Sequence, residues 1–192
     1  MKLRAAFAAM SILLGALSGP LESNAQDGAA IAVLRENGAV ALIRHGDAPG
    51  GTGDPPGFNL NDCSTQRNLS GKGKQQAVRM GQRLKAERVR IGKVLSSPWC
   101  RCMDTAKLLG LGRVEVADTF SNASVLQGRS AALASGARQI IGSWRGPGAL
   151  LVVTHGVNIA ALTGVRPAQG EMVIVKAEPG GKVRSIARIP AP

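Results

Sequence analysis

The sequence predicts an α/β fold in which a mostly parallel central sheet carries helices on both faces. Apolar runs at 39–43 and 149–153 show the continuous hydrophobicity of strands that are buried on both faces. Longer segments with helix-start signals lie between the apolar runs, so strands and helices alternate along the chain. That alternation is typical of three-layer α/β domains.

Local signals predict the other elements in order. A lead-in at 29–35 can form one or two helical turns, and the Gly-, Pro- and Asn-rich stretch 46–68 is expected to be a long loop. Ser70 can cap one helix, and Ser97-Pro98 can begin another. The expected helices run from about 70 to 88, 97 to 109, 128 to 144 and 157 to 162, with strands at 91–95 and 114–116 and a closing hairpin at 171–176 and 182–188.

The N-terminus is expected to be a signal peptide, residues 1–25, followed by a single domain at 26–192. Lys2 and Arg4 precede an apolar stretch, and Ser23-Asn24-Ala25 supplies small residues three apart, as a signal peptidase requires. The apolar stretch is shorter than the ~20 residues that span a bilayer, so cleavage is expected rather than a lasting membrane anchor. We therefore expect a periplasmic or secreted protein without a stable membrane span.

The charge balance favours anionic partners. Without Lys2, Arg4 and Glu22, the mature chain carries 22 basic and 11 acidic residues, a net charge of +11. The mature chain has four Phe, Trp or Tyr residues, too few for the stacking that single-strand binders use: Phe58, Trp99, Phe120 and Trp144. We therefore expect anionic partners such as phosphorylated substrates or anionic lipid head groups, and no nucleic acid.

Three cysteines, Cys63, Cys100 and Cys102, are expected to include one disulfide, since export leads to an oxidising compartment. Cys63 can pair with either Cys100 or Cys102, whereas the latter two are too close in sequence to pair comfortably. Cys-x-Cys is not a standard zinc spacing and histidine is scarce, so no metal site is expected.

The chain contains only two histidines, and they share one local context. His45 and His155 each follow an apolar run and precede a glycine. Ligands of open parallel sheets bind beyond the carboxyl ends of the strands, so two such ends would bring both imidazoles into one crevice. The glycines are expected to let the backbone turn sharply and approach a ligand closely.

Two arginines extend this candidate site. Arg44 ends an apolar run, where an unpartnered cation would be costly to bury. Arg101 lies in the first turn expected after Ser97-Pro98, and a helix N-terminus suits an anion. The planar fork of arginine matches phosphate oxygens, so Arg44 and Arg101 with two histidines indicate a phosphoryl pocket. Arg67 is a further candidate for the cationic surface.

Four motifs in order resemble the histidine phosphatase superfamily, the phosphoglycerate-mutase-like clan. They are Arg44-His45-Gly46, Leu69-Ser70-x-x-Gly73-x-x-Gln76-Ala77, Ser96-Ser97-Pro98-x-x-Arg101-x-x-x-Thr105-Ala106 and Val153-Thr154-His155-Gly156. The short chain is similar to small bacterial members, including phosphohistidine phosphatases, and the signal segment to exported members, some proposed to act on lipopolysaccharide core phosphates.

The resemblance implies hydrolysis of phosphate monoesters without a metal or cofactor, on a phosphorylated small molecule or an envelope glycolipid as substrate. His45 would attack phosphorus and become phosphorylated, and Arg44, Arg101 and His155 would bind the phosphoryl oxygens. Attack requires an unprotonated nitrogen, so activity should fall as His45 is protonated.

The general acid stays open among Asp118, Asp47, Asp54 or none. Asp118 stands near the place of the family's acidic motif, Asp47 is two residues from His45, and Asp54 lies in the 46–68 loop. A site without an acid would favour good leaving groups, including phosphohistidine, and would disfavour mutase activity.

Two other functions compete with this hypothesis. One is a phosphate-binding module that keeps the pocket without turnover. The other is a basic envelope protein that adheres to anionic lipid or lipopolysaccharide, whose binding would be salt-sensitive and would survive loss of both histidines.

Overall fold

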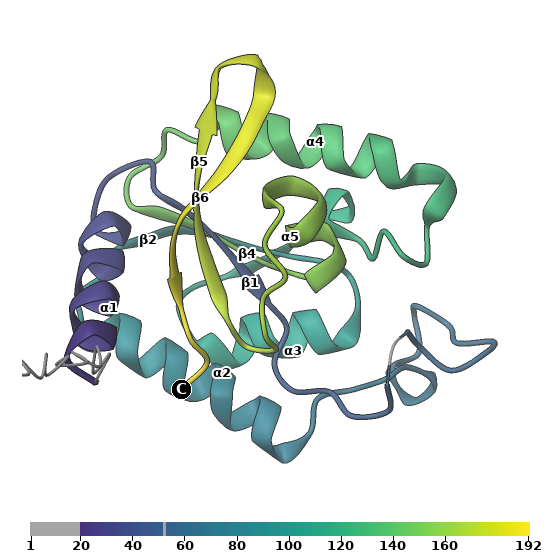
Figure 1. Cartoon of the computed structure of the whole chain (residues 1–192). Helices are drawn as coiled ribbons and strands as arrows, with labels where there is room; N and C mark the ends of the chain where they lie inside the picture. The colour runs from purple at the N-terminus through teal and green to yellow at the C-terminus, as the bar shows by residue number, and fades with distance from the viewer. Residues whose placement is uncertain (1–19, 52) are drawn as a thin grey trace, which may run out of the picture.

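A computed structural model describes residues 20–51 and 53–192, and within this part six strands form one sheet (Figure 1). They are β1 (Val40–Arg44), β2 (Ile91–Ser96), β3 (Val114–Val116), β4 (Ala149–Thr154), β5 (Met172–Glu178) and β6 (Lys182–Ile189). The sheet order is β3-β2-β4-β1-β5-β6. Strands β3, β2, β4 and β1 are parallel, and the β5–β6 hairpin is antiparallel beside β1. The predicted mostly parallel α/β sheet is confirmed.

Helices cover both faces of this sheet, as predicted (Figure 1). They are α1 (Pro20–Leu34), α2 (Gly71–Ala86), α3 (Cys100–Leu109), α4 (Ser130–Ser143) and α5 (Gly156–Thr163). Successive side chains of a strand point to opposite faces. Ile43 and Val153 accordingly pack in the core that includes residues of α1, α2 and α3, whereas Leu42 and Val152 pack in the core with residues of α4 and α5.

Helix α1 is longer than the one or two turns expected for residues 29–35. It begins at Pro20, a first-turn position that proline tolerates, and it is held on the core by Ala30, Ile31 and Leu34. The helix therefore runs past Ala25, where cleavage is predicted. The apolar stretch of the predicted signal peptide lies outside the described residues, and cleavage stays a prediction. No helix of the described part is both long and apolar enough to cross a membrane.

The start of α3 corrects a prediction. Ser97 does not cap this helix; α3 begins at Cys100, with Trp99 at the cap position. The reason is that the Ser97 hydroxyl lies 2.9 Å from Nε2 of His155 and is engaged there. By contrast, Ser70 caps α2 as expected, because its hydroxyl accepts a hydrogen bond from the Gly73 N–H.

Candidate active site

The topology brings the two histidines together at one edge of the sheet. β1 and β4 are parallel neighbours whose register pairs Arg44 with Thr154, so His45 and His155 leave the sheet side by side. Their ring centroids lie 5.6 Å apart at an interplanar angle of 67°, and both side chains are buried. The expectation that these two strand ends form one crevice is confirmed.

A pocket of about 660 Å³ opens in front of the histidines. Four arginines contribute to its lining: Arg44, Arg67, Arg101 and Arg166. Arg101 is fully buried, and its Nε has no hydrogen-bond partner among the described residues; the same holds for Nε of Arg44. Buried guanidinium N–H groups without acceptors suit an anion that supplies the missing oxygens.

The nucleophile candidate is held in a defined tautomer. Nδ1 of His45 lies 2.9 Å from the Gly46 carbonyl oxygen, which can only accept a hydrogen bond. Nδ1 therefore carries the proton, and Nε2 keeps its lone pair. This arrangement leaves Nε2 as the nitrogen that can attack an electrophile.

Three side chains, Ser97, Trp99 and Cys102, contact the imidazole ring of His155. Its Nε2 lies 2.9 Å from the Ser97 hydroxyl, and its ring meets the Trp99 ring edge-on at 5.4 Å. The Cys102 sulfur lies 3.6 Å from the same nitrogen, and burial raises the pKa of this thiol to about 12. With hydroxyl and thiol both able to donate to Nε2, the ring proton is assigned to Nδ1.

Glycine after each histidine has a packing reason, and Gly156 also lines the pocket of His45. A Cβ at Gly46 would lie 2.6 Å from the Gly73 carbonyl oxygen, so the first turn of α2 sits directly on this backbone. A Cβ at Gly156 would lie 3.2 Å from Cδ and Nε of Arg44. The glycines therefore make room for α2 and for the arginine beside the nucleophile.

Two residues of the recognised motifs fix the backbone that follows His45. The Thr105 hydroxyl accepts a hydrogen bond from the Gly46 N–H at 3.1 Å, and the Gln76 side-chain oxygen accepts one from the Asp47 N–H at 2.8 Å. Both side chains are buried. α2 and α3 thus position His45 through its neighbours.

Asp54 is the residue whose role sequence reasoning missed. Its buried carboxylate accepts from Nη1 of Arg101 at 2.5 Å and from Nη2 at 3.2 Å, and it also accepts from the Trp99 indole at 3.0 Å and from the Arg67 backbone N–H. Burial alone would raise the pKa of Asp54, but the hydrogen bonds and charge of Arg101 outweigh it and hold this pKa below its ordinary value. Asp54 is thus an ionised partner that aligns Arg101.

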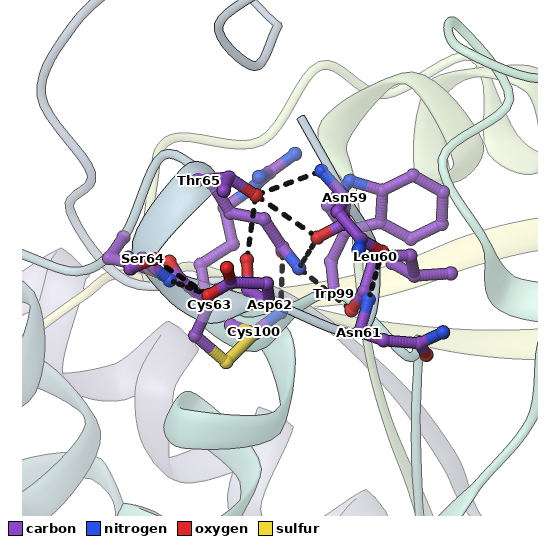
Figure 2. Close-up of a disulfide and its surroundings, with 12 residues drawn as sticks. Asn59, Leu60, Asn61, Asp62, Cys63, Ser64, Thr65, Trp99 and Cys100 are labelled. Carbon is purple, nitrogen blue, oxygen red and sulfur yellow. Dashed lines mark hydrogen bonds between the residues drawn. A yellow bond between two sulfur atoms is a disulfide. The ribbon is translucent and has the colours of Figure 1, made fainter. Parts of the chain in front are cut away.

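The 46–68 loop, whose Gly51, Gly53 and Arg67 line the pocket of His45, is tied to the start of α3. Cys63 and Cys100 form a disulfide, so the first of the two predicted pairings is confirmed (Figure 2). Beside it, the buried Gln66 accepts from the Cys100 N–H and donates to the carbonyl oxygens of Asn59 and Leu60. The loop therefore holds Asp54 against Arg101 through covalent and polar links.

Removing this disulfide is expected to lower the free energy of unfolding by about 3 kcal/mol, because it crosslinks residues 37 positions apart. Urea unfolding of Cys63→Ala against the native protein measures the difference. Reductant serves as the control, since it should destabilise the native protein and leave Cys63→Ala unchanged. Equal stability of the oxidised native protein and the variant would contradict the prediction.

Comparison with known proteins agrees with this geometry. The sequence pattern of the histidine phosphatase superfamily (branch 1) matches residues 40–132, which include His45 and Arg101. The chain belongs to the histidine phosphatase superfamily. Comparison with curated proteins finds no match.

Solved structures share the fold of this histidine phosphatase family member at low sequence identity. The protein histidine phosphatase SixA, complexed with tungstate, matches with a TM-score of 0.51 and 20% identity over 80% of this chain and 97% of that chain. Mycobacterial hydrolase 1 matches with a TM-score of 0.56 and 18% identity over 80% of this chain and 97% of that chain. A phosphoserine phosphatase from Entamoeba histolytica, in complex with 3-phosphoglyceric acid, matches with a TM-score of 0.52 and 15% identity over 72% of this chain and 90% of that chain.

The three acid candidates of this family member lie in different places. Asp54 is paired with Arg101. Asp47 accepts from the Ser70 hydroxyl and lines a separate hollow beside α2, and Asp118 is exposed beside a third hollow with Phe58 and Trp99. No carboxylate of the described residues lines the pocket of His45. Nor do His, Cys, Asp and Glu in that part form a group of three placed to hold a metal ion.

Both active-site histidines are expected to stay neutral throughout the physiological range. Burial, opposed by the Gly46 hydrogen bond and reinforced by Arg101, Arg44 and Arg67, lowers the pKa of His45 to about 3. Burial, followed by the charge of Arg101, also lowers the pKa of His155. Because the chain has only two histidines, the NMR titration of the untagged protein is simple to assign with His45→Gln.

Neither imidazole signal should shift between pH 5 and 8. The unfolded chain binds protons at both rings below about pH 6.5 and the folded protein does not, so the free energy of unfolding should fall as pH drops from 6.5 toward 3. An imidazole that titrates with a midpoint near 6.5 would contradict the burial argument.

Proposed function

We propose that this protein is an exported phosphatase that hydrolyses phosphate monoesters through a phosphohistidine intermediate on His45. The observation that carries the proposal is a neutral imidazole with an unprotonated Nε2 in a pocket lined by four arginines. A nucleophile surrounded by fixed cations suits attack on a dianionic phosphoryl group, because the cations offset the repulsion and the developing charge.

In the proposed reaction Nε2 of His45 attacks phosphorus in line while the bond from phosphorus to the leaving oxygen breaks. Arg44, Arg101 and the Nδ1–H of His155 donate to the phosphoryl oxygens. Water then attacks phosphorus, the bond to Nε2 breaks, and inorganic phosphate leaves with His45 regenerated; the proton that this water gives up balances the proton that the departing oxyanion takes from solvent. These steps need no metal or cofactor, because the arginines supply the positive charge.

Export is supported by two features. The N-terminal sequence has the charged, apolar and small-residue regions of a signal peptide. The Cys63–Cys100 disulfide suits an oxidising compartment such as the periplasm or the exterior. Fractionation of cells that express the full chain tests export, with N-terminal sequencing of the mature protein expected to begin at Gln26.

Hydrolysis of para-nitrophenyl phosphate in the presence of EDTA tests the catalytic proposal. Turnover should persist in EDTA, and rapid quench with labelled substrate should trap an acid-labile phosphate on His45. No release of nitrophenol under these conditions would overturn the proposal. Phosphate binding without a labelled enzyme would identify a non-catalytic phosphate-binding member of the fold.

A phosphohistidine-protein phosphatase is the second candidate. It is favoured by the lining of the pocket, which includes no carboxylate of the described residues to protonate a poor leaving group. The SixA fold likeness is compatible with it. Rates on a phosphohistidine protein and on para-nitrophenyl phosphate, compared with the rate on an alkyl phosphate, would rank the leaving groups.

A further inference from the structure

A second, smaller cavity lies between α4 and α5. Its volume is about 140 Å³, and its walls are mostly apolar: Thr119, Ala123, Ser130, Leu133, Ala134, Ala137, Val157, Asn158, Ala161 and Leu162. The polar atoms of Asn158 are already used, because its amide donates to the carbonyls of Phe120 and Ser121 and accepts from the Ala123 N–H. The cavity thus offers little to a polar ligand.

This cavity adjoins the pocket of His45. Val157 and Ala161 line both, and the Val157 side chain is 41% exposed although it is apolar. α5 begins at Gly156, directly after His155, and Ala161 lies about 7.5 Å farther along the helix at 1.5 Å per residue. A group bonded to the phosphoryl oxygen needs only a few bonds to reach the apolar walls.

We infer that the α4–α5 cavity is the leaving-group subsite and takes an alkyl or aryl group. This inference rests on the proposed function, which seats the phosphoryl group beside His45. An engineered cavity of about 150 Å³ in another protein binds benzene, so 140 Å³ suits one ring or a short alkyl chain. The preferred substrates are amphiphilic phosphate monoesters, with the charge among the arginines and the apolar end between the helices.

The same geometry disfavours a strongly hydroxylated leaving group. Hydroxyls placed in this cavity would lose water and could find side-chain partners only in Thr119 and Ser130, which opposes binding. The substrate's polar parts would have to stay in the arginine-lined pocket or in solvent. Phosphate esters of small sugars should therefore be poorer ligands than alkyl phosphates of similar size.

Binding of non-hydrolysable alkylphosphonates by isothermal titration calorimetry tests this subsite independently of turnover. Methyl-, ethyl-, butyl- and hexylphosphonate place the same anion at the arginines and differ only in apolar length. Once the chain reaches Val157, Kd should fall by about threefold to fourfold per added methylene until the cavity is filled. A Kd that does not change from methyl to hexyl would overturn the inference.

A variant in which a larger side chain fills the cavity tests the subsite directly. Ala134 is half-buried and lines this cavity but not the pocket of His45, so Ala134→Leu should block the subsite and keep the helix. The variant should bind methylphosphonate with the Kd of the native protein. Its Kd for hexylphosphonate should be no lower than its Kd for methylphosphonate. Ala132→Leu, on an exposed position of α4 away from the cavity, should keep the native chain-length dependence.

The outcomes separate this inference from the proposed function. Chain-length-dependent binding without hydrolysis of para-nitrophenyl phosphate would support the subsite and refute the enzyme. Hydrolysis with a flat phosphonate series would support the enzyme and refute the subsite. Failure of every phosphonate to bind would refute the subsite, and it would count against the enzyme only if para-nitrophenyl phosphate were not hydrolysed either. An undiminished preference of Ala134→Leu for hexylphosphonate would place the apolar group elsewhere.

Discussion

His45→Ala is expected to lower the hydrolysis of para-nitrophenyl phosphate by at least about a thousandfold, because the attacking nitrogen is lost. The substitution removes Nε2, whose lone pair is free only because the Gly46 carbonyl holds the proton on Nδ1. The arginines of the pocket remain, so the variant should still bind inorganic phosphate. Initial rates and phosphate titration on the same preparation check both expectations.

His155→Ala is the informative control, since the chain has only these two histidines. It removes one donor to the phosphoryl group, and loss of a single such donor typically lowers the rate by about 10²–10³-fold. Labelled phosphate should therefore still accumulate on His155→Ala and be absent from His45→Ala. Label on His45→Ala would show that another residue is the nucleophile.

The parts of the fold that local sequence signals define were predicted well. Buried strands appear in the sequence as continuous apolar runs. The sequence therefore predicted β1 and β4, with a histidine directly after each strand. Side-chain contacts between distant segments leave no such signal. Ser97 shows the difference, because its sequence favours a helix cap while its hydroxyl is used by His155, 58 positions away.

Helix geometry decides which cysteine pairs with Cys63, a choice that the spacing of the cysteines in the sequence left open. Cys100 and Cys102 are equally placed in sequence to meet Cys63. Successive residues of a helix are rotated by about 100°, so side chains two positions apart point to nearly opposite sides. Cys100 faces the loop, whereas Cys102 turns inward and its sulfur lies beside His155.

The acid candidates show the same limit of sequence reasoning. Asp47, Asp54 and Asp118 could each be argued from their positions near the motifs. What separates them is burial and partners: Asp54 meets a guanidinium 47 positions away, and Asp47 and Asp118 line other hollows. A carboxylate aligned on Arg101 could have been suspected only from the need to balance a buried arginine.

Asp54→Ala is expected to lower the free energy of unfolding by about 3–5 kcal/mol, because it leaves the buried Arg101 charge without a partner. It should also lower kcat/KM for para-nitrophenyl phosphate by about a hundredfold, since a misplaced guanidinium binds the transition state poorly. Urea unfolding and initial rates measure the two effects. Asp62→Asn, which alters an exposed carboxylate of the same loop, should leave both stability and rate close to those of the native protein, because asparagine can also accept a hydrogen bond from the Ser64 N–H.

The double variant Asp54→Asn/Arg101→Gln separates the structural role of the pair from its catalytic role. Removing both charges avoids an unpaired buried ion, so much of the stability lost in Asp54→Ala should return. Activity should not return, because the substituted glutamine would lack the cationic fork that Arg101 offers to phosphoryl oxygens. Recovery of activity together with stability would mean that Arg101 only holds the loop, and the phosphoryl group would then be bound by His155 and the other arginines of the pocket.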